Sequence, residues 1–287
     1  RAASSVINSL IALAVPFLLM ASGHTGTEAM ALFGSSVGMA MPLLYIPITV
    51  VGSLAFVMIP TVSTGISKGH TKHVNAQVES AIGFSVIIAS LFVPMFFALG
   101  EPIGRFVYDN ADAGRFITAS AWLLVPLSVE NITSSVMNSL DLELKSFINY
   151  LIGSAVMFAI LFAFYGNFNI IILSIGMGTG WTVTCALHIL SIRKKTGLGF
   201  SYMGKLVKSV LLTIPTVFVT KCVFSLLSGL ALFWSIAISL LISLAFYAAL
   251  AFVFGLIDVD FFKTGVKTSA KRKQKTKQEA KKGQIAC

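Results

Sequence analysis

Eight apolar stretches constrain the fold of this chain most, because each is long enough to cross a lipid bilayer. Each contains about 20 residues, the length that an α-helix needs to span the hydrocarbon core. They cover roughly residues 3–21, 37–60, 80–99, 116–138, 147–165, 169–191, 207–228 and 231–256. Backbone N–H and C=O groups find no water inside a bilayer, so spanning segments are helices or closed barrels. The pattern predicts an all-α polytopic membrane protein with eight transmembrane helices.

The amino-acid composition agrees with a membrane protein. Hydrophobic residues make up 56% of the chain and charged residues only 11%. A soluble domain contains about 25% charged residues. The composition therefore excludes an ordinary soluble domain of this length.

The Lys and Arg residues are unevenly distributed between the two sides of the predicted membrane. If Arg1 is cytoplasmic and the spans alternate, 18 of the 21 Lys and Arg residues lie in cytoplasmic segments. Only Arg105 and Arg115 lie outside, and Lys221 lies within a span. Cytoplasmic loops of membrane proteins are enriched in Lys and Arg. We therefore predict that both termini are cytoplasmic. Topology then explains the net charge of +10, and no nucleic-acid partner is predicted.

Three prolines, Pro42, Pro47 and Pro60, interrupt the second apolar stretch. An interior proline costs a soluble helix about 3 kcal/mol. In a membrane bundle, neighbouring groups satisfy the freed carbonyls, so kinked helices persist. We predict helix kinks at these prolines. Transporters use such helices to line a cavity, although a kinked packing helix is an equally valid interpretation.

The fourth predicted span carries polar residues and one carboxylate. Asn131, Ser134, Ser135 and Asn138 lie on one helix face, and Glu130 borders that face. A charge inside a span costs about 2.5–3.5 kcal/mol on the insertion scale, so it indicates a functional site. Glu130, Asn131, Ser134 and Asn138 are therefore candidates to line a transport cavity, with Glu130 as a polar contact or a coupling site for ions or protons. Alternatively, Glu130 is neutral and hydrogen-bonded within the bundle.

Two further ionisable residues lie inside predicted spans. Lys221, in the seventh span, either extends toward the outer interface or faces a groove where it contacts a pyrophosphate or acidic sugar. His188 lies near the end of the sixth span, on one face with Trp181 and Thr184. A buried structural histidine is favoured there over a proton relay.

The sequence contains no pattern typical of an enzyme, a metal site or a cofactor site. Cys185, Cys222 and Cys287 have no paired spacing. The glycines of 176–180 lie inside an apolar span with no following lysine, which favours close helix packing over nucleotide binding. We predict that the chain is not an enzyme and binds neither a metal nor a cofactor.

Several segments resemble a known transporter family. They are EAMALFG (28–34), GMAMPLLYIP (38–47) and SLAFVMIPTVS (53–63), with Asn8, Ser9 and Pro16 upstream. Together they resemble the second half of the stage V sporulation protein B family, and the resemblance covers residues 1 to about 257. That family belongs to the polysaccharide transporters, with the peptidoglycan-precursor flippases and, more distantly, the multidrug and toxin extrusion transporters.

The resemblance implies a division of the chain. Relatives have two six-helix lobes and an appended helix pair, and eight helices with a cytoplasmic start match the second lobe and that pair. Residues 1–192 would then form a six-helix C-terminal lobe. Residues 193–257 would form a cytoplasmic loop and two appended helices, and residues 258–287 a basic, disordered cytoplasmic tail. A first lobe would come from a longer chain or from a separate partner.

The resemblance also implies a function. It is the flipping of lipid-linked oligosaccharide or peptidoglycan precursors by alternating access, in a bacterial plasma membrane, for cell-envelope or spore-cortex assembly. The partners would be membrane lipids and the lipid-linked glycan precursor. Two alternatives remain open: a cation-coupled multidrug or toxin exporter of the same superfamily, and a non-transporting membrane scaffold for envelope assembly.

Overall fold

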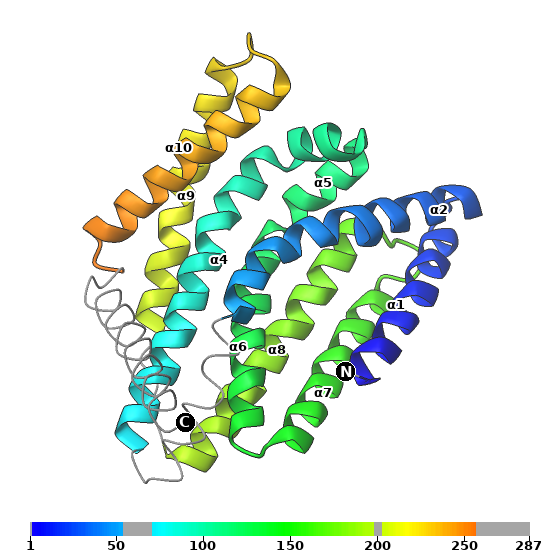
Figure 1. Cartoon of the computed structure of the whole chain (residues 1–287). Coiled ribbons are helices and arrows are strands. Elements are labelled where there is room, and N and C mark those ends of the chain that lie inside the picture. The colour runs from blue at the N-terminus through cyan, green and yellow to red at the C-terminus, as the bar shows by residue number, and fades with distance from the viewer. Residues whose placement is uncertain (1, 54–70, 198–202, 257–287) are drawn as a thin grey trace, which may run out of the picture.

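The computed structural model describes residues 2–53, 71–197 and 203–256, and this part of the chain is helical, with no strand (Figure 1). The helices are α1 (Ala2–Ala21), α2 (Gly26–Phe33), η1 (Gly34–Ala40), α4 (Thr71–Tyr108), α5 (Ala111–Ser120), η2 (Ala121–Leu123), α6 (Leu124–Ser139), α7 (Glu143–Ala163), α8 (Ile170–Thr196), α9 (Met203–Leu226) and α10 (Leu232–Val253). Residues 41–53 continue the helix that begins with α2.

Seven helical segments are long and apolar enough to cross a membrane. They are Gly26–Ser53, Val74–Tyr108, Ala111–Ser139, Glu143–Ala163, Ile170–Thr196, Leu206–Leu226 and Leu232–Val253. A shorter apolar helix, Ser5–Ala21, corresponds to the first predicted span. The predicted fold class, an all-α polytopic membrane protein, is confirmed, and each predicted stretch coincides with one apolar helix.

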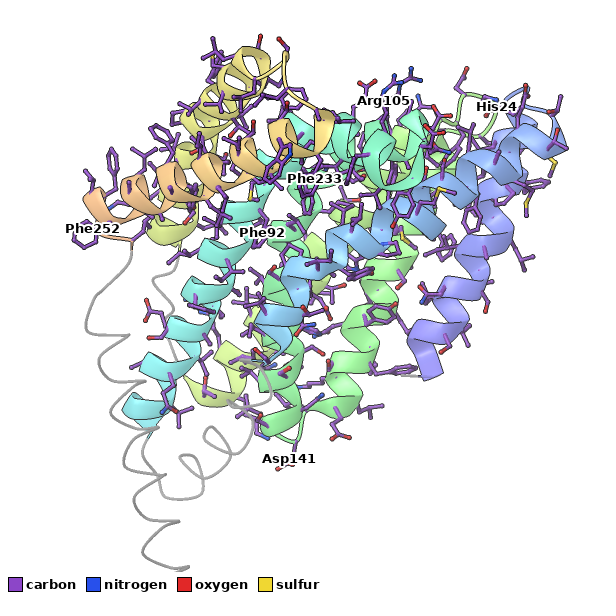
Figure 2. All side chains as sticks on the ribbon, turned by 45° about the horizontal axis from the view of Figure 1, so that its top comes forward. His24, Phe92, Arg105, Asp141, Phe233 and Phe252 are labelled. Carbon is purple, nitrogen blue, oxygen red and sulfur yellow. The ribbon has the colours of Figure 1, made fainter. Side chains whose placement is uncertain are left out.

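The helices run between two ends of the molecule, which we name after residues labelled in Figure 2. The Arg105 end also carries His24 and, nearby, Phe233, whereas Asp141 lies at the opposite end. The turn at Asp141 connects α6 to α7. α6 and α7 connect at the Asp141 end, whereas the described connections from α4 to α5 and from α7 to α8 lie at the opposite end, as expected of segments that cross a membrane in turn (Figure 1).

The second membrane-spanning helix begins earlier than predicted, at Gly26 rather than at residue 37. Thr25 caps it: the Thr25 side chain accepts a hydrogen bond from the Glu28 N–H, and the Thr25 N–H donates to Glu28 Oε2 over 2.9 Å. This reciprocal pair is a capping box, which satisfies donors at the start of a helix. The Thr-x-x-Glu spacing in the sequence is the signal that the prediction overlooked.

The predicted proline kinks fall next to an irregular part of this helix. Residues Gly34–Ala40 form a π-helix, and the Met41 N–H donates to the carbonyl of Ser36, five residues back. Pro42 follows at once and has no N–H for the carbonyl of residue 38, so the regular pattern is interrupted there. Pro47 lies within helical residues 41–53. Pro60 lies outside the described residues.

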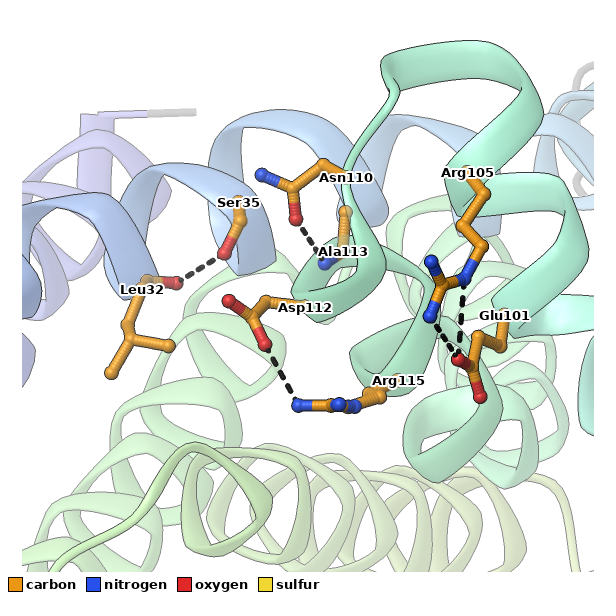
Figure 3. A network of polar contacts seen from close by, with 8 residues as sticks. All are labelled: Leu32, Ser35, Glu101, Arg105, Asn110, Asp112, Ala113 and Arg115. Atoms are coloured by element: carbon orange, nitrogen blue, oxygen red, sulfur yellow. Dashed lines mark hydrogen bonds and ion pairs between the residues drawn. The ribbon is translucent and has the colours of Figure 1, made fainter.

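Residues 100–115, predicted to form an extramembrane loop, are mainly helical. α4 continues to Tyr108, and only residues 109–110 separate it from α5. The Asn110 side chain caps α5 by accepting a hydrogen bond from the Ala113 N–H over 2.9 Å (Figure 3). The helices therefore extend beyond the predicted apolar segments, through residues that carry charges.

The charges in this region form two ion pairs along helix faces (Figure 3). Arg105 Nη2 lies 2.9 Å from Glu101 Oε1, and Arg115 Nη1 lies 3.2 Å from Asp112 Oδ1. All four side chains are substantially exposed. Exposed pairs of this kind contribute about 0–1 kcal/mol to the free energy of folding. They therefore stabilise the ends of these helices slightly and do not determine the fold.

The glycines of α8 pack against different neighbours, as the small-residue interpretation expected. A Cβ atom on Gly176 would lie 2.7 Å from Leu161 Cδ2, and one on Gly178 would lie 1.9 Å from the Trp122 ring. Trp122 Nε1 also donates to Ser174 Oγ over 3.2 Å. These glycines let α8 approach its neighbours closely.

Buried hydroxyl groups lie where α9 and α10 pack against each other and against α4. Thr220 Oγ1 donates to Ser243 Oγ over 2.9 Å, between α9 and α10. The fully buried members of this hydroxyl seam are Ser90 on α4, Ser209, Thr216 and Thr220 on α9, and Ser239, Ser243 and Tyr247 on α10. Polar side chains of this kind join helices in membranes. The pair α9–α10 therefore rests on α4, while the predicted domain boundaries near 192 and 257 remain predictions.

Candidate functional site

A cavity of about 590 Å³ lies between α1, helical residues 41–53, α6, α7 and α8. Its lining extends from Asn138 and Glu143, both exposed near the Asp141 end, to the buried Met157 and Met177 on α7 and α8. Polar side chains from four helices reach it: Asn8, Glu130, Ser134, Asn138, Ser146 and Thr184. A concave site with a few convergent polar groups is the usual form of a ligand site.

α6 supplies one polar wall of this cavity. Glu130, Ser134 and Asn138 follow one another at intervals of four residues, so they lie on one face of the helix, and all three line the cavity. Asn131 lies beside them and faces another helix: a Cβ on Gly52 would be 3.9 Å from Asn131 Oδ1. The structure thus brings three of the four α6 candidates together at the cavity.

Aromatic side chains form much of the remaining wall. Tyr45 comes from helical residues 41–53, Phe147 and Tyr150 from α7, and Trp181 from α8. Tyr45 and Tyr150 lie within electrostatic range of the Glu130 carboxyl group. The sequence had placed Trp181 on one face with Thr184, and both line the cavity. It had not indicated the two tyrosines, because nothing local relates residue 45 to residue 150.

The charges of the cavity are acidic. Glu130 and Glu143 line it, and none of its described lining residues is Lys or Arg. A concave surface with charges of one sign attracts ions of the opposite sign and repels like charge. The described wall therefore suits a neutral polar group or a cation better than an anion.

Lys221, the remaining candidate, lies away from this cavity. Its Nζ is 5.6 Å from the centre of the Phe97 ring, so α9 and α4 meet there through a cation–π contact. Its side chain is exposed, five residues before the end of α9 at Leu226. This position allows the ammonium group to extend toward the Arg105 end. A contact with pyrophosphate remains a prediction.

α7 and α8 approach each other closely in the wall of the cavity, at Gly153, Gly180 and Thr184. A Cβ on Gly153 would lie 2.0 Å from Thr184 Oγ1 and 2.5 Å from the Gly180 carbonyl oxygen. Thr184 Oγ1 donates to that same carbonyl over 2.9 Å. Gly153, Gly180 and Thr184 all line the cavity, so this contact determines the shape of its wall.

His188 is fully buried where α6, α7 and α8 meet. Its Nδ1 lies 3.2 Å from Thr133 Oγ1 on α6, and its Nε2 lies 3.3 Å from Ser146 Oγ on α7. Ser146 lines the cavity, whereas His188 lies behind it. This placement supports the structural interpretation, in which the ring joins three helices.

We therefore predict that His188→Ala destabilises the fold without a specific effect on transport. Losing a buried, hydrogen-bonded side chain and leaving its partners unsatisfied should cost about 1–3 kcal/mol. The measurement is thermal unfolding of the protein in detergent, together with transport per folded molecule. A variant of wild-type stability that has lost transport would indicate a relay instead.

Comparisons with known proteins find a likeness in structure only. The sequence matches no family model and no curated protein. The structure is similar to that of the lipid II flippase MurJ in an inward closed conformation, with a TM-score of 0.63 and 16% sequence identity. The match covers 81% of this chain and 48% of the flippase chain, so this chain spans about half the length of that protein. The chain therefore shares its fold with about half of a lipid II flippase.

Proposed function

We propose that this protein is part of a membrane flippase for lipid-linked oligosaccharide or peptidoglycan precursors, rather than an enzyme. The observation that supports this proposal best is the fold that 81% of the chain shares with a lipid II flippase. The resemblance of residues 28–63 to the stage V sporulation protein B family supports a role in cell-envelope or spore-cortex assembly. The membrane would then be the bacterial plasma membrane.

The cavity suggests how the chain would contribute. Its volume of about 590 Å³ would accommodate part of a polar headgroup. The lipid tail would stay in the membrane, in contact with the apolar outer faces of the helices. Side chains such as Phe218 and Leu241 are exposed on α9 and α10, and these helices would provide an apolar surface for the tail. Alternating access would require a second lobe opposite this cavity, from a longer chain or from a partner.

One observation favours a second candidate, a cation-coupled exporter. The described cavity lining contains two carboxylates and neither Lys nor Arg. Exported organic cations would be attracted to such a site. The two candidates differ in the molecule that crosses the membrane.

Reconstitution of the whole protein, with both lobes present, distinguishes them. Vesicles would contain a fluorescent lipid-linked oligosaccharide, and a membrane-impermeant quencher would report the fraction that has changed leaflets. We expect faster exchange than in protein-free vesicles, and no concentrative uptake of an organic cation dye. Dye uptake without lipid exchange would overturn the flippase proposal.

The predicted orientation is tested by labelling single cysteines. In a background without Cys185, Cys222 and Cys287, we expect a cysteine at Arg105 to react with an impermeant maleimide in intact cells. A cysteine at Asp141, at the opposite end (Figure 2), should react only after the membrane is opened. The reverse pattern would place both termini outside.

A further inference from the structure

We propose that the cavity binds an ammonium group carried by the substrate, so that this lobe recognises a cationic part of the headgroup and not its phosphate. The inference rests on the proposed flippase function and specifies which part of the substrate faces this half. It depends on three features of the cavity: a carboxyl group with no cationic partner among the described residues, three aromatic side chains in the same lining, and the absence of Lys and Arg from that described lining.

Glu130 is the central feature. It lies on α6 inside an apolar bundle, its side chain is half-buried, and it lines the cavity. Among the described residues, Glu101 and Asp112 have cationic partners, and Glu130 has none. A carboxylate in a membrane span is costly and is usually paired or functional. A cationic ligand would supply the missing counter-charge.

The aromatic side chains of the same cavity provide a second reason. Tyr45, Tyr150 and Trp181 come from three different helical segments and line the same cavity. Tyr45 and Tyr150 are within electrostatic range of Glu130. The face of an aromatic ring attracts cations, and cages of such rings bind ammonium groups in proteins. A carboxylate in a cavity that tyrosine and tryptophan rings also line therefore suits an alkylammonium ion.

The same charges argue against a phosphate in this cavity. A pyrophosphate here would face Glu130 with no Lys or Arg in the described wall to neutralise it. Like charges in a site of low dielectric constant repel strongly. The phosphate of a lipid-linked precursor would have to contact another part of the protein. Asn8, Ser134 and Asn138 remain available for the neutral hydroxyl and amide groups of a headgroup.

Ligand binding to the purified protein in nanodiscs of zwitterionic lipid tests this inference. The probes are phenyltrimethylammonium and phenylphosphonate, which have similar size and opposite charge. The readout is tryptophan fluorescence, since Trp181 lines the cavity. We expect a saturable change with the ammonium probe, none with the phosphonate, and no saturable change in Trp181→Phe.

Two matched substitutions localise the binding. Glu130→Gln should weaken binding of the ammonium probe by roughly tenfold or more. Glu101→Gln, which removes an exposed glutamate outside the cavity, should leave binding unchanged. Saturable binding of the phosphonate, or ammonium binding of equal affinity in Glu130→Gln and the wild type, would overturn the inference.

The outcome can be separated from that of the proposed function. Lipid exchange without ammonium binding would contradict the inference and leave the flippase proposal intact. Saturable ammonium binding without lipid exchange, accompanied by uptake of the probe into vesicles, would support the cavity assignment and favour an exporter.

Discussion

Replacing Gly153 with leucine is expected to separate α7 from α8 and to abolish the folded protein. Even the first added atom, Cβ, would lie 2.0 Å from Thr184 Oγ1 and 2.5 Å from the Gly180 carbonyl oxygen. The carbonyl belongs to the backbone, so no rotation of a side chain relieves both contacts. Overpacking usually costs about 1–3 kcal/mol, and we expect about 3 kcal/mol or more here because whole helices must move.

The measurement is the yield of monodisperse protein after detergent extraction, and its melting temperature where protein remains. Gly38→Ala is the matched control, because a Cβ on Gly38 would meet nothing within 4 Å. Its effect should stay within about 1 kcal/mol, the range of a glycine-to-alanine change in a helix. Wild-type yield and stability for Gly153→Leu would show that α7 and α8 are not packed as described.

Hydropathy predicted the spans well, because a bilayer requires long apolar segments whatever their neighbours are. It predicted their ends poorly, because helices extend beyond the apolar segments. Glu101 and Arg105 form their ion pair on the last turns of α4, and Asn110 caps α5. Capping signals such as Asn110 and the pair Thr25–Glu28 were readable in the sequence.

The site was only partly predictable. The spacing of Glu130, Ser134 and Asn138 indicated a common helix face, and that face lines the cavity. The positions of Tyr45 and Tyr150 depend on how helices pack, which no local pattern records. Lys221 was predicted as a candidate because it is a charge inside a span, but the structure places it over the Phe97 ring, away from the cavity.

The hydroxyl seam could have been predicted, at least along α10. Ser235, Ser239 and Ser243 recur every four residues in an otherwise apolar helix, and all three are buried. Tyr247 continues this face and is also buried. A polar stripe on a membrane helix indicates a face that avoids lipid. The same reasoning that identified the polar face of α6 thus extends to α10.

Glu130→Gln is expected to slow transport strongly while leaving the amount of protein in the membrane unchanged. Glutamine preserves the size and shape of the side chain, replaces one carboxyl oxygen with an NH2 donor, and removes the ability to carry a negative charge. The carboxyl group is half-buried and forms no ion pair among the described residues, so the fold should tolerate the change. A hydrogen bond to a charged group contributes about 1.5–3 kcal/mol, which predicts a decrease in transport of roughly 10- to 150-fold.

The measurement is the rate of lipid exchange in vesicles that contain equal amounts of folded wild-type and variant protein. Glu101→Gln is the control, because Glu101 is an exposed glutamate on α4 whose pairing with Arg105 contributes little. Unchanged transport in Glu130→Gln would show that this residue has no role in the mechanism and that its role in the bundle is structural. Loss of transport at full expression, with Glu101→Gln normal, would place the carboxylate on the path of the substrate or its coupling ion.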